Sequence, residues 1–315
     1  MIEEKTPHEI VNEEKRRLLF SKKFIKYFIR FFYYDQILPR RVDQETALLA
    51  KYCYLLIRHV DDVADGDYQI FPNQYIQEQY IATLRYWLST EESSEESDRN
   101  YKSSEPTILI LYQAALDLFK ERGLDNDEMQ TLFKKAIDPI FFDYERALAT
   151  SNHHILSHEQ LREYFYNTFA PSIDIMLITM REKFRSVDVP FLSIGQGQLY
   201  SLADLEVDWK RGIINLPAQL LEEAKLNGSS TYHQVINNQV ILRYLLNEIY
   251  LAKPQLQELK QQIQQLQHPE TKRMCGHLVR TMESIISIQE PRLRLQLLKK
   301  GIRLTQEESF DENSL

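Results

Sequence analysis

Signals for strands and tight turns are scarce along this chain, and their scarcity constrains the fold more than any other feature. Only eight of the 315 residues are glycine, and Leu, Gln, Glu, Ile and Lys dominate the composition. The regularly spaced Gly and Asn turns that bound strands are missing, as are the glycine-rich phosphate loops GxGxxG and GxxxxGK[ST]. We therefore expect an all-α fold.

Composition and charge exclude several classes of protein. The net charge of −8 argues against nucleic acid as the main partner. No stretch reaches the roughly 18 uninterrupted apolar residues of a membrane-spanning helix, and the start, Met-Ile-Glu-Glu-Lys, lacks the order of a signal peptide. Cys53 and Cys275 each stand alone in helical sequence, so we expect packed thiols in a reducing compartment rather than a disulfide. Together these features predict a cytoplasmic protein.

The helical pattern predicts one domain at 19–304. A charged segment, 1–18, precedes it and is expected to be loose or helical at the surface, and an acidic tail, 305–315, follows it. Residues 89–106 are highly charged and poor in apolar side chains, which predicts a disordered loop; helical periodicity resumes at 108, so it is no domain boundary. Helices are expected at about 44–65, 107–122, 126–150, 158–184, 192–208, 215–226, 231–251, 254–267, 270–289 and 291–303.

One segment suggests a contact with lipid. Residues 24–34 read Phe-Ile-Lys-Tyr-Phe-Ile-Arg-Phe-Phe-Tyr-Tyr, which is aromatic and basic. Such a segment could rest on a membrane surface as a peripheral contact. The other interpretation is an ordinary amphipathic helix packed on the core, and the sequence leaves both open.

Two short acidic stretches contain the candidate functional residues of this chain. Each places two aspartates four residues apart, Asp61 with Asp65 and Asp204 with Asp208. On a helix, side chains at i and i+4 share a face, with Cβ atoms about 5–6 Å apart. Basic residues lie beside both pairs: Arg58, Lys210 and Arg211. One acidic pair alone could be a solvated helix face, but two with basic flanks indicate a site for metal and diphosphate.

Such a site suits one class of reaction. Two carboxylate pairs on facing helices would hold Mg²⁺ ions that also bind substrate phosphates, and the metal and basic residues would neutralise a departing diphosphate. An allylic carbocation would then need shielding from water, for which the 18 Tyr and 15 Phe residues offer an aromatic lining. Aromatic stripes on helices are, however, usually core.

At these motifs the chain resembles the squalene and phytoene synthases, head-to-head prenyl synthases of the isoprenoid synthase fold. Their first motif has its tyrosine, arginine and two aspartates at Tyr54, Arg58, Asp61 and Asp65. Their second motif, two aspartates followed by basic residues, glycine and Leu-Pro, is found at 204–217, and Tyr164-Phe-Tyr166 matches the start of a helix between them. The resemblance covers about 40–290. It implies a single-domain all-α isoprenoid synthase bundle with a central apolar cavity.

The chain also departs from the family pattern. Ahead of the second aspartate pair the family usually has Gln, Asn and Arg, where this chain has Gly197, Tyr200 and Ala203. The family glycine that makes room for the prenyl chain falls at Ile173, and a C-terminal tyrosine falls near Met282. Losing one arginine from a diphosphate clamp would weaken binding by about 1.5–3 kcal/mol. The chain thus resembles a divergent member of the family, and the larger Ile173 predicts a shorter or shifted prenyl site.

The resemblance implies roles for named residues. The four aspartates would hold Mg²⁺, with Asp62 as a neighbouring reserve or a solvated residue. Arg58, Lys210 and Arg211 would contact the diphosphate, although Lys210 and Arg211 could instead be helix C-terminal charges interacting with the dipole. Tyr54 and Tyr164 would hydrogen-bond the diphosphate or face the cation, with a core tyrosine as the alternative for Tyr164. Residues expected to line the hydrocarbon pocket are Phe169, Ile173 and Met176.

Three histidines, at two places in the sequence, are not expected to be metal ligands. His59 is expected to be a surface or packed residue, and His153-His154 has no partner at metal-ligand spacing.

The implied reaction is Mg²⁺-dependent condensation of two farnesyl or geranylgeranyl diphosphates through a cyclopropyl diphosphate. Squalene-type enzymes then reduce the intermediate with NADPH, whereas phytoene-type enzymes lose a proton without it. A second hypothesis is a non-catalytic scaffold or assembly factor that keeps the fold, favoured by the missing Asn and Arg. A third, a terpene cyclase or head-to-tail prenyltransferase, ranks lower because those families space their acidic motifs differently.

Overall fold

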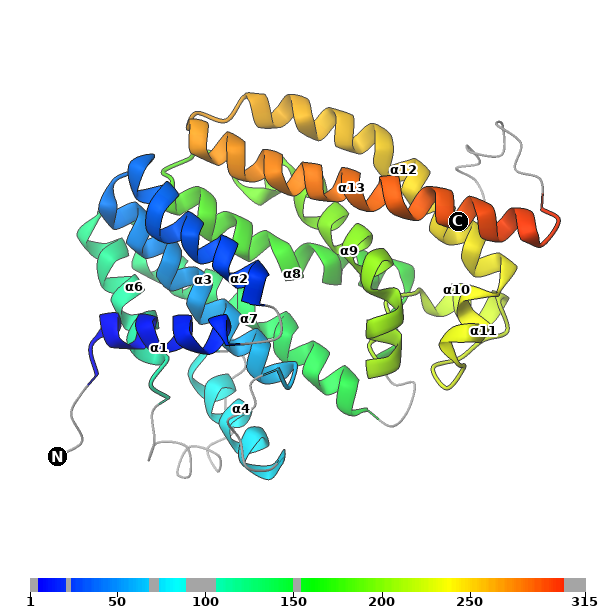
Figure 1. The fold of residues 1–315 in the computed structure, drawn as a ribbon, viewed down its shortest axis with the longest axis horizontal. Coiled ribbons are helices and arrows are strands. Elements are labelled where there is room, and N and C mark those ends of the chain that lie inside the picture. The colour runs from blue at the N-terminus through cyan, green and yellow to red at the C-terminus, as the bar shows by residue number, and fades with distance from the viewer. Residues whose placement is uncertain (1–4, 21–23, 68–73, 89–105, 150–153, 303–315) are drawn as a thin grey trace. The chain divides into compact units, whose positions relative to one another are not determined.

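The computed structural model describes residues 5–20, 24–67, 74–88, 106–149 and 154–302. Within these ranges every regular element is helical and no strand occurs (Figure 1), so the predicted all-α fold is confirmed. The chain divides into two compact units. Unit 1 comprises Met1–Tyr144 and Pro171–Phe184, and unit 2 comprises Glu145–Ala170 and Arg185–Leu315. The single domain with a central apolar cavity stays a prediction.

Unit 1 is organised around α3 (Gln44–Ala64), which packs against α1, α4 and α6. Asp43 caps α3 by accepting a hydrogen bond from the Thr46 N–H at 2.8 Å, and Gly66, with φ of +72°, follows its end. The predicted helix at 44–65 is thus confirmed. The other elements are α1 (Pro7–Leu19), α2 (Phe24–Phe32), a π-helical turn (Tyr33–Ile37), a 3-10 turn (Leu38–Arg40), α4 (Gln74–Leu88), α6 (Leu109–Glu121) and most of α7 (Asn126–Leu148).

Within the predicted N-terminal segment 1–18, the residues from Pro7 onward form a packed helix rather than a loose chain. α1 begins with a capping box in which Thr6 and Glu9 satisfy each other's backbone N–H groups. One face of α1 is buried, and its members are Ile10, Val11, Glu14 and Leu18. Because Glu14 is buried on this face, α1 places an acidic side chain inside unit 1.

Unit 2 packs two long helices, α12 (Gln239–Gln264) and α13 (Pro269–Lys299), against each other and against α9 (Pro190–Arg211) (Figure 1). The first part of α8 (His158–Thr179) also belongs to this unit. Shorter elements complete it: a 3-10 turn (Ser186–Asp188), α10 (Ala218–Glu223) and α11 (Tyr232–Ile236).

Three predicted helix boundaries in unit 2 are wrong. The predicted helix 231–251 is broken at Asn238, whose side chain accepts from the Val240 and Ile241 N–H groups and so starts α12. The predicted breaks before 254 and 291 do not occur, because Pro254 and Pro291 lie inside α12 and α13. A proline removes one helical hydrogen bond, but the apolar residues buried on both sides of each proline keep these helices continuous.

The remaining predictions concern the acidic loop and tail, the two cysteines and membrane-spanning helices. The predicted loop at 89–106 lies outside the described residues except for Pro106, and so does the tail at 305–315. Cys53 and Cys275 are buried free thiols, as predicted. Within the described ranges no helix is both long and apolar enough to span a membrane.

Candidate functional site

The first aspartate pair lies where α3 ends. Asp61 is in its last turn and Asp65 is its C-cap, with the Asp65 N–H donating to the Asp61 carbonyl at 2.8 Å. Both side chains are half-buried. The predicted placement of the pair on one helical face is therefore correct.

Arg58 lies beside this pair, one turn earlier on α3. Its guanidinium forms ion pairs with Asp61 and Asp62 and stacks over the Tyr27 ring, 5.6 Å from the ring centroid. Arg58 is thus held among the carboxylates of the first motif, and its contact with a diphosphate stays a prediction.

Asp62 is not the solvated residue that the sequence suggested. It is 2% exposed, and besides Arg58 it accepts from Arg17 of α1 at 2.6 Å. A buried carboxylate needs such partners because desolvation without them is costly. Asp62 therefore fastens α1 to α3 and fixes Arg58.

A second contact between α1 and α3 runs through Glu14, which the sequence reasoning missed along with Arg17. Glu14 lies 3.1 Å from His59 Nδ1 and 2.8 Å from the Arg17 guanidinium, and the other His59 nitrogen lies 2.9 Å from the Tyr80 hydroxyl. Burial alone would raise the pKa of Glu14, but its hydrogen bond and charge interactions with His59 and Arg17 outweigh burial and lower it. His59 is a packed residue, as expected.

Tyr54 lies on α3, one turn before Arg58. Its ring stacks on Tyr34 at 5.1 Å between centroids, and Arg30 of α2 donates to its hydroxyl at 3.2 Å. The Arg30 guanidinium is also 5.3 Å from the Tyr54 ring centroid. Tyr54 is therefore a half-buried tyrosine with a cationic neighbour.

The second aspartate pair lies in the last turns of α9. Asp204 is exposed and Asp208 is half-buried. α9 ends at Gly212 in the left-handed region, φ +84°, and the Ile213 N–H closes the turn on the Asp208 carbonyl at 2.9 Å. The two pairs lie in different units, so their meeting in one site stays a prediction.

Asn215, just after this turn, reaches back to the second pair. Its amide nitrogen donates to Asp208 Oδ2 at 3.1 Å, and its amide oxygen accepts from Arg146 Nη1 at 3.0 Å. Arg146, near the end of α7, is 1% exposed and also donates to the Ile214 carbonyl. Neither Asn215 nor Arg146 was predicted from the sequence, because nothing in local spacing links them to Asp208.

Gly197, Tyr200 and Ala203, the three positions that depart from the family pattern, differ in how they are packed. A Cβ at Gly197 would lie 2.5 Å from the Phe165 Cβ, so this glycine lets α9 approach α8 closely. Tyr200 packs edge-to-face on Phe169 with centroids 5.8 Å apart. Ala203 is exposed. The first two positions therefore take part in helix packing, through the missing side chain of Gly197 and the ring of Tyr200.

The basic residues at the end of α9 differ in surroundings. Lys210 is exposed and pairs with Glu206 at 2.6 Å, one turn back on the same helix, which fits the helix-end interpretation. Arg211 is half-buried. Their contact with a diphosphate stays a prediction.

Tyr164 is half-buried on α8, and the Arg146 guanidinium lies 5.3 Å from its ring centroid. Of the predicted pocket residues, Ile173 is 5% exposed and Phe169 and Met176 are half-buried. Ile173 and Met176 belong to unit 1 and Phe169 to unit 2, so a shared hydrocarbon pocket stays a prediction.

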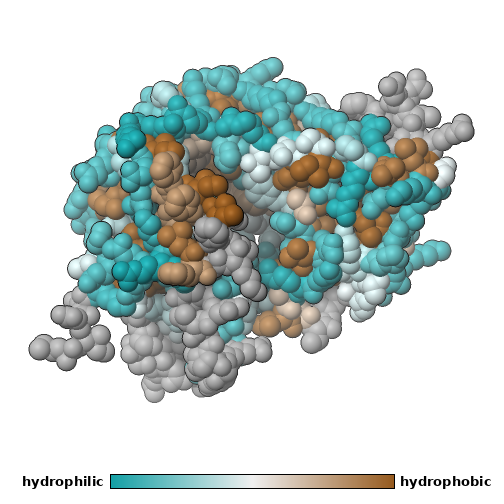
Figure 2. All heavy atoms as spheres, in the orientation of Figure 1, coloured by the Kyte–Doolittle hydropathy of each residue, from teal (hydrophilic) through white to brown (hydrophobic). Residues whose placement is uncertain are grey.

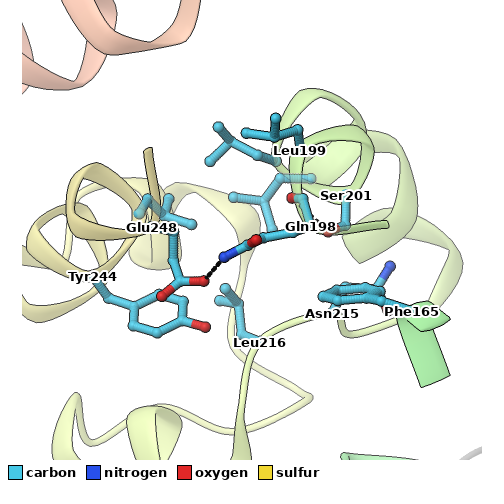
Figure 3. Close-up of a pocket in the computed structure, with 11 residues that line it drawn as sticks. Phe165, Gln198, Leu199, Ser201, Asn215, Leu216, Tyr244 and Glu248 are labelled. Atoms are coloured by element: carbon cyan, nitrogen blue, oxygen red, sulfur yellow. Dashed lines mark hydrogen bonds between the residues drawn. The ribbon is translucent and has the colours of Figure 1, made fainter. Parts of the chain in front are cut away.

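A small pocket of unit 2 contains an acidic residue that the sequence did not single out. Gln198 of α9 points across the pocket and donates its amide hydrogen to Glu248 of α12, and the Tyr244 hydroxyl points into the same space (Figure 3). Burial raises the pKa of Glu248, although the hydrogen bond from Gln198 and the charges of His158 and Arg162 oppose the shift. Glu248 therefore keeps its proton to a higher pH than an ordinary glutamate.

The two aspartate pairs form a donor set of the kind that Mg²⁺ prefers. They offer carboxylate oxygens, which this ion prefers, and none of the four aspartates is fully buried. In the described part of the chain no three Asp, Glu, His or Cys side chains converge as a metal site. Since Mg²⁺ keeps waters and substrate phosphates among its ligands, two carboxylates per pair fit an ion that arrives with a diphosphate.

A model of the squalene/phytoene synthase family matches residues 30–288. The match includes both aspartate pairs and runs from α2 into α13. No curated protein and no solved structure matches the chain. The chain belongs to the squalene/phytoene synthase family, whose chemistry is the condensation of prenyl diphosphates in isoprenoid biosynthesis.

Proposed function

We propose that this member of the squalene/phytoene synthase family is a prenyltransferase that condenses two prenyl diphosphates head to head in a Mg²⁺-dependent reaction. The observation that carries the proposal is the retention of both aspartate pairs, each on the end of a helix, within the 30–288 family match. The substrates would be farnesyl or geranylgeranyl diphosphate. The product would be of the squalene, dehydrosqualene or phytoene type, formed through a cyclopropyl diphosphate.

The aspartates bind and orient the diphosphates in this proposal. Asp61 and Asp65 would hold Mg²⁺ on α3, and Asp204 and Asp208 would hold it on α9. When bound, the ion supplies positive charge that stabilises the departing diphosphate.

The basic residues add charge on the protein side. Arg58 is held by Asp61 and Asp62, and it would donate hydrogen bonds to a diphosphate that binds beside these carboxylates. Charge-assisted hydrogen bonds of this kind are about twice as strong as neutral ones. Lys210 and Arg211 would serve the second diphosphate in the same way.

Aromatic and apolar side chains would exclude water from the allylic cation. Tyr54 and Tyr164 each have a guanidinium over the ring, of Arg30 and Arg146 respectively, and these cation–π contacts support a role for the two rings in stabilising the allylic cation. The hydrocarbon would lie along Phe169, Ile173 and Met176.

Product analysis tests the proposal. Purified protein is incubated with farnesyl or geranylgeranyl diphosphate and Mg²⁺, with and without NADPH, beside a variant carrying Asp61→Ala and Asp65→Ala. The expected result is a C30 or C40 product, or the cyclopropyl diphosphate, that is absent from the variant. Dependence of the hydrocarbon on NADPH would assign the squalene branch, and its formation without NADPH the phytoene branch. No product from either substrate would contradict the proposal.

The second candidate function, a non-catalytic scaffold that keeps the fold, is favoured by one observation. Gly197 and Tyr200 are used for packing, against Phe165 and Phe169, so two family polar positions now serve the helix interface. Prenyl diphosphate that binds in the presence of Mg²⁺ but is not turned over would support this candidate.

The location that fits this function is the cytoplasm, with α2 in peripheral contact with a membrane. Figure 2 shows apolar side chains gathered over α2. Tyr27 and Phe31 are buried on its inner side, while side chains on its outer side are more than half exposed: Ile25, Phe28, Ile29 and Phe32. A helix with an outer apolar face of this kind can lie in the lipid interface.

Sedimentation with anionic vesicles tests the membrane contact. A Phe28→Glu, Ile29→Glu variant should remain in the supernatant, whereas Val187→Glu, at an exposed apolar residue of the 3-10 turn Ser186–Asp188, should sediment like the wild type. Equal sedimentation of all three proteins would contradict it.

A further inference from the structure

The turn after α9 builds a connection from a buried arginine to the second aspartate pair. Gly212, at φ +84°, reverses the chain, and Asn215 thereby comes within 3.1 Å of Asp208. On its other side Asn215 lies 3.0 Å from Arg146. All of these residues belong to unit 2.

Arg146 determines which way the Asn215 amide points. A guanidinium has only donors, so the Asn215 oxygen must face Arg146 and its NH₂ group must face Asp208. Arg146 is itself fixed, because it is 1% exposed, donates to the Ile214 carbonyl and stacks over Tyr164. The buried Arg146 therefore fixes Asn215 as the donor of the hydrogen bond to Asp208.

We infer that Arg146 and Asn215 are positioning residues that orient the Asp208 carboxylate for Mg²⁺ and diphosphate. This inference rests on the proposed function. Asn215 holds one oxygen of Asp208, which limits rotation of the carboxylate. Groups that hydrogen-bond to metal ligands in this way typically change metal affinity or activity by about 10–100-fold when removed.

Arg146 reaches Asp208 through Asn215 in this connection, and this order predicts how the variants combine. Without Arg146 the Asn215 amide can rotate and present its oxygen to Asp208, which would be repulsive. Without Asn215 this connection from Arg146 to Asp208 is broken. Removing both should therefore weaken metal binding no more than removing Asn215 alone.

The experiment measures binding of inorganic diphosphate in the presence of Mg²⁺ by titration calorimetry, together with the Mg²⁺ concentration that gives half-maximal condensation. The variants are Asn215→Ala, Arg146→Met, Arg146→Lys and the double variant Asn215→Ala, Arg146→Met, with Asp208→Asn as the loss standard. Asn237→Ala is the matched control, since the side chain of this exposed asparagine bonds only within α11 and its cap. Circular dichroism confirms that each variant is folded.

The expected result is a rise of about tenfold or more in the dissociation constant and in the required Mg²⁺ concentration for Asn215→Ala. Arg146→Met should act in the same direction, Arg146→Lys should recover part of the loss, and the double variant should match Asn215→Ala. A merely structural role would lower Tm without changing the Mg²⁺ requirement.

Two results would overturn the inference, and they differ. If the wild type binds diphosphate and Asp208→Asn does not, yet Asn215→Ala binds like the wild type, the positioning role is wrong and the proposed function stands. If the wild type binds no diphosphate at any Mg²⁺ concentration, the proposed function fails and this inference fails with it.

Discussion

Gly197 allows α9 to pack closely on Phe165, and replacing this glycine should destabilise the fold. An ideal Cβ at this position would lie 2.5 Å from the Phe165 Cβ and 2.7 Å from its Cγ. Since the nearest atom is a Cβ, rotation of the Phe165 side chain cannot relieve the overlap. Overpacking of a core costs about 1–3 kcal/mol, and so close an approach places Gly197→Ala near the upper value.

The helix itself opposes this effect. Alanine is favoured over glycine inside a helix by about 1 kcal/mol, which leaves a net loss of about 2 kcal/mol for Gly197→Ala. For a unit of this size each kcal/mol lowers Tm by about 2–4 °C, so we expect a fall of about 4–8 °C in thermal unfolding followed by circular dichroism. Gly276→Ala is the matched control, because a Cβ at Gly276 would meet only the flexible end of Arg280 at 3.5 Å.

The control variant should gain stability from helix propensity while Gly197→Ala loses it. Equal Tm changes for the two variants would refute the packing argument. The same overlap predicts that Gly197→Gln, which restores the family residue, is more damaging still. Ala203→Arg, at an exposed position, should be tolerated and should tighten diphosphate binding by about tenfold or more, since a charged hydrogen bond contributes about 1.5–3 kcal/mol.

Three further predictions concern single side chains. Burial raises the pKa of Glu248 above its ordinary 4.5, so wild-type stability should fall as pH rises from that value through the raised pKa. Glu248→Gln should therefore raise Tm more at pH 8 than at pH 4. A gain in Tm confined to pH 4 would contradict this. Gly212→Ala places a Cβ at φ +84° and should lose about 1–2 kcal/mol in urea unfolding; an unchanged midpoint would argue against a strained turn. Arg17→Met leaves Asp62 with Arg58 as its partner and should lose about 1–3 kcal/mol; full stability would mean that the bond from α1 contributes nothing.

The sequence predicted the parts of this protein that depend on neighbours along the chain. The all-α fold, the helix that ends at Asp65 and the shared face of each aspartate pair follow from residues a few positions apart, which share a helical face. Periodicity did not reveal that the helices continue past Pro254 and Pro291, because tertiary packing overrides the local preference of proline.

Residues that come together from distant parts of the chain were missed for the same reason. Arg17 is 45 positions from Asp62, and Arg146 is 69 from Asn215. No local pattern distinguishes these arginines from solvated ones, so Asp62 was interpreted as a reserve ligand or a solvated residue. The roles of the aspartates as metal ligands and of the pocket residues stay predictions.

If this divergent chain ionises prenyl diphosphates, as proposed, it must release inorganic diphosphate, which can be measured directly. With farnesyl or geranylgeranyl diphosphate and Mg²⁺, we expect one diphosphate released per cyclopropyl diphosphate formed and two per hydrocarbon, with release lost in Asp204→Asn, Asp208→Asn. The opposite result is binding of prenyl diphosphate with no release of diphosphate at any Mg²⁺ concentration. It would contradict the proposed condensation and support the non-catalytic scaffold.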